Sequence, residues 1–123
     1  MILVDTSVWI RVWTGAHGFQ ATMALLRQRP EIGGHELVHG ELLAGDRGGR
    51  AAVLAEYMRL PWAPRLAHAE VAHFVRLRGL HGRGAGWVDL HLLASALVRR
   101  WRLWSADERT AALADELGIG FKM

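Results

Sequence analysis

Apolar runs alternate with amphipathic segments along this chain, and the two patterns predict strands and helices in turn. Residues 1–4 form a continuous apolar run that ends at Asp5, as is typical of a short strand buried in a parallel sheet. Later short apolar segments predict weaker strands. The predicted strands cover residues 1–4, 31–33, 60–62, 103–105 and 119–121.

Helical spacing of apolar residues fills the segments between these strands. Gly15, Gly18 and Pro30 separate or end the first helices, because glycine and proline disfavour a helix interior. The predicted helices cover residues 6–13, 19–28, 35–44, 50–59, 66–77, 88–100 and 108–117. This alternation predicts an α/β fold of three layers, with a mainly parallel sheet of about four to five short strands. In such a sheet the functional crevice lies beyond the carboxyl ends of the strands.

The length and composition bound the possible classes of protein. The chain has 123 residues, 51% of them hydrophobic, which predicts a single domain over residues 1–123. It contains no cysteine, which excludes disulfides, thiolate zinc sites and a cysteine nucleophile. No apolar run approaches the roughly 20 residues that cross a bilayer, and a carboxylate interrupts the first run too early for a signal peptide. We therefore expect a cytoplasmic protein with no membrane partner.

The chain is basic, and its basic residues are almost all arginines. Lys122 is the only lysine among 15 basic residues, and the formal net charge is +3. The planar guanidinium group suits bidentate contacts with phosphate. An arginine-rich proteome explains the composition equally well, so charge alone only permits a nucleic-acid partner.

Four acidic residues stand where the pattern predicts a crevice. Asp5 ends the first strand and Asp107 follows the strand at 103–105, so both are expected at the carboxyl edge of the sheet. Asp89 and Glu41 are predicted to lie on the inward faces of their helices, between apolar neighbours on a helical wheel. Capping of a helix or turn is an alternative explanation for Asp5 and Asp107. For Asp89 the alternative explanation is a favourable interaction with the helix dipole, and for Glu41 it is a salt bridge to an arginine.

Taken together, the four carboxylates favour a metal site. Converging carboxylates repel one another and raise each other's pKa, and a divalent cation removes that repulsion. Ligation by oxygen alone suits Mg²⁺ or Mn²⁺. Such an ion can activate water, orient a phosphodiester and neutralise charge on the departing oxygen.

Four segments resemble, in order, the motifs of the PIN-domain family and, within it, the VapC-type toxins of toxin–antitoxin pairs. The first two are MILVDTSVWI and HELVHGELLAG, with Asp5 and Glu41 at the acidic positions. The most specific match is GRGAGWVDLHLLASALV, which carries the third acid onto Asp89. The last is LWSADERTAALADELGI, with Asp107 as the fourth acid. It departs from the family's usual Thr-x-Asp by having Ser105, which retains the hydroxyl group.

The resemblance implies a PIN sandwich of α/β/α layers with metal-dependent endoribonuclease activity. It implies that Asp5 and Asp89 are the principal ligands of Mg²⁺ or Mn²⁺, and that the other two acids complete the cluster and help to position water. The residues implied for catalysis and metal binding are Asp5, Glu41, Asp89 and Asp107, with Thr6 and Ser105 in support.

The resemblance also implies partners. It implies frequent homodimerisation, inhibition by a VapB-like antitoxin, and structured RNA such as transfer or ribosomal RNA as the substrate. Two alternatives use the same fold: a solitary PIN nuclease, and a nucleic-acid-binding module that no longer cuts. A silent module would be expected to lack an acid, and all four are present.

Residues 35–39 match HExxH, the signature of zinc proteases. In that mechanism His35 and His39 bind zinc one helical turn apart, and Glu36 is the general base. Two glycines precede His35, which puts it at the start of the helix, outside the rigid setting that a zinc pair needs. No extended HExxHxxGxxH pattern follows, so we expect an accidental match.

A phosphoryl-accepting aspartate is another interpretation of Asp5, as in haloacid dehalogenase-like phosphatases or receiver domains. The first class needs a second aspartate two residues later, where this chain has Ser7. The second class needs a lysine after a late strand, and the only lysine is Lys122. Both classes are therefore disfavoured.

Overall fold

Three short parallel strands form the centre of the fold. The computed structural model describes residues 1–123, the whole chain. Leu3 pairs with Gly33 on one side and with Leu103 on the other, so the first strand is central and buried, which explains its unbroken apolar sequence. The strands are β1 (Ile2–Val4), β2 (Ile32–Gly33) and β3 (Arg102–Trp104), in the order β2-β1-β3.

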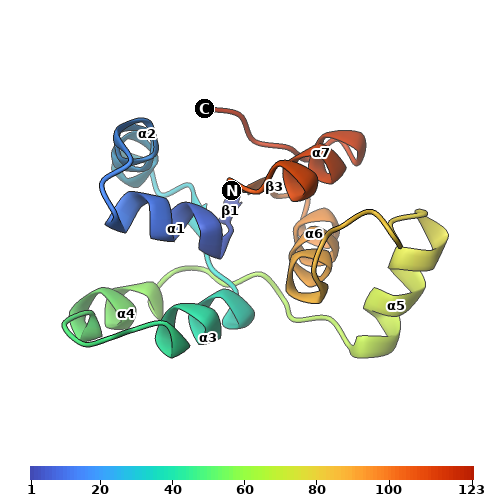
Figure 1. Cartoon of the computed structure of the whole chain (residues 1–123), viewed down its shortest axis with the longest axis horizontal. Helices are drawn as coiled ribbons and strands as arrows, with labels where there is room; N and C mark the ends of the chain where they lie inside the picture. The colour runs from blue at the N-terminus through green and yellow to red at the C-terminus, as the bar shows by residue number, and fades with distance from the viewer.

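Seven helices surround this sheet. They are α1 (Thr6–Trp13), α2 (His17–Gln28), α3 (Glu36–Ala44), α4 (Ala51–Tyr57), α5 (His68–Leu77), α6 (Trp87–Arg99) and α7 (Glu108–Glu116). Figure 1 shows α1 to α4 on its left and α5 to α7 on its right, with the strands between them. Helix α1 contacts α2 and α3, while β3 contacts α6 and α7. The predicted α/β fold with a parallel sheet is confirmed.

The sheet has fewer strands than the four to five that the sequence predicted. The segments at 60–62 and 119–121 each form only one isolated parallel bridge, at the two edges of the sheet. Pro61 has no N–H group to donate to a ladder, and Gly120 has no side chain to pack against a neighbour. Each segment therefore extends the sheet by two hydrogen bonds and no further.

All seven predicted helices are present, with ends that differ by a few residues. Helix α2 begins at His17, before Gly18 rather than after it, because glycine in the first turn does not remove any helical hydrogen bond. Helix α3 begins at Glu36, and His35 is its N-cap residue. Helix ends of this kind depend on local capping that periodicity does not resolve.

One cluster of 26 buried hydrophobic residues fills the space between the sheet and the helices. Helix α6 is buried most completely, since every residue from 90 to 96 is buried. Such all-round burial is typical of a helix in the interior of a domain. None of the helices combines the length and the apolar character that crossing a membrane requires.

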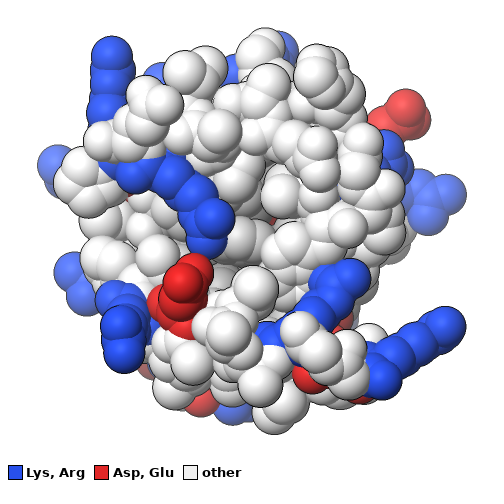
Figure 2. All heavy atoms as spheres, turned by 90° about the vertical axis from the view of Figure 1, so that its left-hand side faces the viewer, with Lys and Arg blue, Asp and Glu red and all other residues white.

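The face formed by α2 and α4 is hollowed at its centre, as Figure 2 shows. A cavity of about 350 Å³ opens between these helices and the start of β2. Arg27 and Glu56 form an ion pair of 3.9 Å at its rim. None of the four predicted acids lines this hollow, so it is separate from the candidate site described next.

Candidate active site

The carboxyl ends of β1 and β3 bring Asp5 and Asp107 to the same edge of the sheet. Asp5 follows the last residue of β1, and its N–H donates to the Trp104 carbonyl at the end of β3 (2.9 Å). This hydrogen bond extends the ladder between the two strands by one residue. Asp107 lies three residues beyond Trp104, at the edge where the sequence predicts a crevice.

Neither aspartate caps a helix through its side chain. Asp5 is the N-cap residue of α1 and Asp107 is that of α7, but neither carboxylate accepts a capping hydrogen bond from the backbone. The Oδ2 atom of Asp107 instead accepts a hydrogen bond from the Thr110 hydroxyl (2.9 Å). Capping therefore does not explain either side chain.

Two serine hydroxyls hold one oxygen of the buried Asp5 carboxylate, whose residue is 3% exposed. Ser7 and Ser105 donate to Asp5 Oδ2 over 2.9 and 2.8 Å. Each serine also accepts a backbone N–H, from Ala106 (3.0 Å) and Asp107 (3.1 Å). A hydroxyl has one hydrogen to donate and can accept through its lone pairs. Each serine therefore accepts a backbone N–H and donates its only hydrogen to Oδ2 of Asp5. Neither serine contacts the other oxygen, Oδ1, which leaves that oxygen to face a ligand.

The pKa values of the acids link all four carboxylates to one region. Burial raises the pKa of Asp5 in spite of its two serine hydrogen bonds, and the charge of Asp107 raises it further. The pKa of Asp89 is raised to about 6, first by burial and then by the negative charges of three acids. Those acids are Asp5, Asp107 and Glu41. Mutual repulsion of this kind shows that residues far apart in the sequence are electrostatic neighbours in the fold.

Asp89 lies half-buried in the first turn of α6. Its Oδ2 atom accepts the N–H of Gly86 (3.3 Å), so it partly closes the start of the helix. Leu93 and Ala96, the neighbours predicted to share its face, are fully buried. Asp89 therefore lies at the end of the buried face of α6, where its side chain is partly shielded from solvent.

Glu41 corrects one expectation, because its side chain is exposed although the sequence placed it on a buried face. Val38 and Leu42 are the buried residues of α3, and Glu41 lies about 60° from the first of them, at the border of that face. Its Oε1 atom accepts a hydrogen bond from the Thr6 hydroxyl (2.6 Å). None of the ion pairs in the structure involves Glu41, so a salt bridge does not explain it.

Sequence reasoning assigned support to Thr6 and Ser105 but missed Ser7. Ser105 does contact Asp5, whereas Thr6 contacts Glu41 instead. Ser7 joins Asp5 to the segment after β3 by one donated and one accepted hydrogen bond. The only signal in the sequence is a hydroxyl two residues after the first acid, a spacing common in turns.

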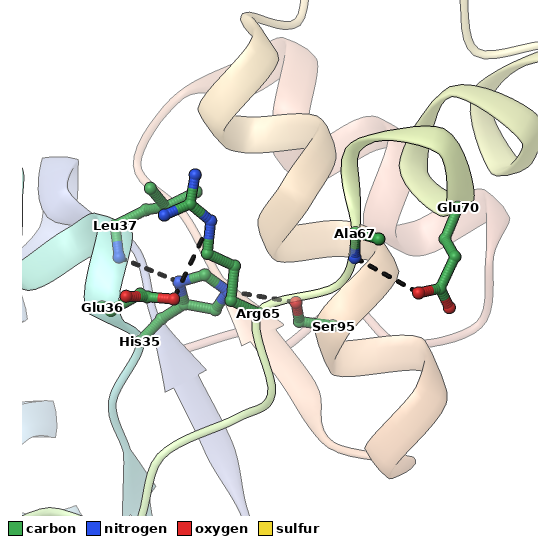
Figure 3. A network of polar contacts seen from close by, with 7 residues as sticks. All are labelled: His35, Glu36, Leu37, Arg65, Ala67, Glu70 and Ser95. Carbon is green, nitrogen blue, oxygen red and sulfur yellow. Dashed lines mark hydrogen bonds and ion pairs between the residues drawn. The ribbon is translucent and has the colours of Figure 1, made fainter.

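The HExxH segment does not form a zinc site. His35 is fully buried, its Nδ1 atom accepts the N–H of Leu37 (3.0 Å), and its Nε2 atom lies 3.1 Å from the Ser95 hydroxyl. Figure 3 shows His35 between α3 and α6, with both ring nitrogens engaged in this way. Glu36 points toward Arg65, at an N···O distance of 3.8 Å. Neither nitrogen of His35 is free to bind a metal, so the zinc protease interpretation is wrong.

Known proteins place the chain in a family. The model of the family described as "PIN domain" matches residues 2–116. The chain belongs to the PIN-domain family. Relatives of this PIN protein include ribonuclease VapC32 from Mycobacterium tuberculosis, in strain CDC 1551 / Oshkosh and in strain ATCC 25618 / H37Rv. Each is 43% identical over 120 residues, which cover 97% of this chain and 94% of the relative.

PIN nucleases typically depend on a metal, and the donor atoms of this PIN protein fit a hard cation. The candidate donors are all oxygens, and the serines hold only one of the two carboxylate oxygens of Asp5. Burial and the charges of neighbouring acids raise the pKa of Asp89. Hard, oxygen-preferring ions such as Mg²⁺ or Mn²⁺ suit this chemistry. In this structure no three His, Asp or Glu side chains lie close enough together to coordinate the same ion.

Proposed function

We propose that this PIN protein is a Mg²⁺- or Mn²⁺-dependent endoribonuclease that cleaves structured RNA, such as transfer or ribosomal RNA, as the toxin of a VapBC-type pair. The observation that carries the proposal is the position of Asp5 at the carboxyl ends of β1 and β3, where Ser7 and Ser105 hold one oxygen of its buried carboxylate. The charges of Asp5, Asp107 and Glu41 also help burial to raise the pKa of Asp89, which supports the convergence of the four acids. Carboxylates that repel one another at the edge of a sheet are expected to share a cation. The 43% identity to ribonuclease VapC32 supports RNA as the substrate.

In this proposal Asp5 and Asp89 hold the ion, and Glu41 and Asp107 complete the acidic cluster. When bound, the cation supplies Lewis acidity toward the phosphate and lowers the pKa of a water molecule. The chain's own contribution is to fix the ligands. Two hydroxyls fix Oδ2 of Asp5 and leave Oδ1 for the ion, and Thr6 restrains Glu41 by its hydrogen bond of 2.6 Å.

Sequencing of RNA ends after pulsed expression tests the activity and identifies the substrate together. We expect new 5′ ends at a few positions in one class of structured RNA, and none with the Asp5→Asn variant. With purified protein, the same cuts should need Mg²⁺ or Mn²⁺ and stop in EDTA. Cleavage that persists in EDTA would contradict the proposed metal chemistry. Binding of RNA without any cleavage would favour the silent module.

Removal of the Ser7 hydroxyl is expected to weaken Mn²⁺ binding about 10-fold, because hydrogen bonds behind a metal ligand typically contribute 10- to 100-fold to affinity. Ser7→Ala leaves Asp5 Oδ2 with one donor and the Ala106 N–H without its acceptor. Ser7→Thr keeps the hydroxyl and should bind within about two-fold of the wild type. Titration calorimetry of the metal-free protein measures these affinities.

Thr14→Ala is the matched control for Ser7→Ala. Thr14 is an exposed hydroxyl residue that bonds only to carbonyls of its own helix, α1. Its removal should leave Mn²⁺ affinity unchanged. If Ser7→Ala binds Mn²⁺ as well as Thr14→Ala does, Ser7 does not position the ligand.

The proposal extends to the partners and the location of the protein. We propose a single domain over residues 1–123, supported by the single hydrophobic cluster, that forms a homodimer in the cytoplasm and is inhibited by a VapB-like antitoxin. Light scattering behind a sizing column tests the dimer. Co-expression with a VapB-like antitoxin should abolish cleavage, whereas a solitary nuclease would stay active.

A further inference from the structure

An open cavity adjoins the acidic site between α1 and α7. Its volume is about 500 Å³. Ser7 and Ala106 line it, and these two residues belong to the hydrogen-bond network around Asp5. The cavity therefore reaches the acidic site through Asp107, which lines it, and through Ser7, which binds Asp5. Its lining residues are Ser7, Arg11, Ala106, Asp107, Glu108 and Arg109.

Two arginines from different helices lie on this cavity. Arg11 belongs to the last turn of α1 and Arg109 to the first turn of α7. None of the ion pairs in the structure includes either of them, although Glu108 lines the same cavity. The Arg11 guanidinium lies 5.5 Å from the centre of the Phe19 ring, a contact that holds its charge without neutralising it. Both guanidinium groups are therefore available to an anion.

The loop between α5 and α6 gives Arg109 a defined path. A Cβ atom on Gly84 would lie 2.6 Å from Arg109 Cδ and 3.1 Å from its Nε, so the arginine stem crosses directly over the glycine. Gly84 also has a φ of +90°, which other residues rarely adopt. The adjacent Arg83 binds both carboxylate oxygens of Glu116, which ties this loop to α7. Gly84 therefore leaves room for Arg109 at a fixed place beside the site.

We propose that Arg11 and Arg109 bind backbone phosphates of the RNA strand next to the bond that is cut, so that this cavity is the channel for the substrate strand. The inference rests on the proposed function and names the residues that grip its substrate. A planar guanidinium donates two parallel hydrogen bonds to phosphate oxygens. The acids would hold the cation at one phosphate, and the arginines would bind the neighbouring phosphates on the same strand. Glu108 opposes this binding, because it adds a negative charge to the lining of the same cavity.

The test measures binding rather than cleavage. In the Asp5→Asn background, which keeps RNA intact, affinity for fluorescein-labelled unfractionated transfer RNA is measured by anisotropy in EDTA from 50 to 200 mM KCl. Arg11→Gln and Arg109→Gln are each expected to weaken binding about 3- to 10-fold. Each should also lower the slope of log K against log salt by roughly 0.7 to 1, the value for one lost phosphate contact.

Matched controls and an opposite-sign variant sharpen this test. Arg59→Gln and Arg76→Gln remove the same charge from exposed arginines that do not line the cavity, and they should change the affinity less than two-fold. Glu108→Gln should tighten binding, because it removes a negative charge from the cavity and leaves the metal-site acid Asp107 in place. If the two cavity arginines behave like the two control arginines, the inference is wrong.

A double-mutant cycle tests whether Gly84 acts through Arg109. Gly84→Ala should weaken binding as much as Arg109→Gln does, and it should have no further effect once Arg109 is replaced. Additive losses would contradict the positioning role of Gly84.

Metal-dependent cleavage by the wild type is measured separately, so that the two proposals can fail independently. If the wild type cleaves RNA but the arginine variants bind RNA as tightly as their background protein does, only this inference is wrong. A protein that neither binds nor cuts RNA overturns the proposed function as well.

Discussion

Replacement of Asp5 by asparagine is expected to lower metal-dependent RNA cleavage by roughly a thousandfold, equivalent to about 4 kcal/mol of transition-state stabilisation. The two serine hydroxyls both donate to Asp5 Oδ2, so an asparagine will turn its carbonyl oxygen toward them. Its NH₂ group then takes the place of Oδ1. A donor would thus stand where the cation needs an acceptor, with hardly any change in shape.

The same substitution should not unfold the protein. Burial raises the pKa of Asp5, which means that the fold disfavours its ionised form. A neutral amide of the same shape should therefore leave the unfolding midpoint of the metal-free protein equal or higher. Addition of Mn²⁺ should raise the midpoint of the wild type but not that of the variant, because only the wild type binds the ion tightly.

Asp115→Asn is the matched control for Asp5→Asn. Asp115 is an exposed acid of α7 that pairs with Lys122 at 3.6 Å, and it takes no part in the network around Asp5. This variant should cut RNA at the wild-type rate and respond to Mn²⁺ as the wild type does. An Asp5→Asn protein that cleaves in Mg²⁺ as fast as the wild type would refute the assignment of Asp5.

The elements that carry the acids could be predicted from the sequence because their signals are local. A short apolar run that stops at Asp5 defines β1 without knowledge of its neighbours. The alternation of strands and helices then requires parallel pairing, which puts Asp5 and Asp107 at one edge. The prediction of two outer strands was wrong for an equally local reason. Pro61 and Gly120 weaken strand pairing in these segments, which form only isolated bridges.

The support around the acids could not be predicted, because it depends on distances between segments that are far apart in the sequence. Ser7 binds a backbone N–H that lies 99 positions away, and no pattern within α1 announces that partner. A helical wheel assigned Glu41 to a buried face because its neighbours are apolar. The border of that face is set by how α3 packs, and Glu41 lies just outside it beside Thr6.

Lowering the pH from 6.5 to 4 is expected to remove about 3 kcal/mol of folding stability through His35. Burial, together with the charges of His91 and Arg65, lowers the pKa of this histidine from 6.5 to about 4. Between these two pKa values the unfolded chain binds a proton that the folded protein refuses. The contribution is therefore fully present above pH 6.5 and is lost as the pH falls to 4.

The structure explains why the folded protein refuses this proton. Nδ1 of His35 accepts the N–H of Leu37, so the neutral ring carries its hydrogen on Nε2, which faces the Ser95 hydroxyl. A second proton on the ring would replace the acceptor at the start of α3 with a donor. The ring is fully buried, so water cannot compensate for that loss.

The readout is the difference in unfolding free energy between the wild type and His35→Asn, measured by urea denaturation at several pH values. Asparagine is a good N-cap residue that can accept the Leu37 N–H without titrating. The difference is needed because Asp89, with a pKa raised to about 6, acts in the opposite direction and destabilises the fold as the pH rises from 3.8 through 6. Both proteins share that effect, so it cancels.

We expect the wild type to be more stable than His35→Asn at pH 7, because the variant loses the contact with Ser95 and leaves a gap between α3 and α6. This difference should shrink by about 3 kcal/mol as the pH falls to 4. For a His81→Asn variant, at an exposed histidine, the curve of unfolding free energy against pH should run parallel to that of the wild type. If the His35→Asn curve is also parallel, His35 is not held neutral by the fold, and its hydrogen bonds in Figure 3 do not exclude a proton.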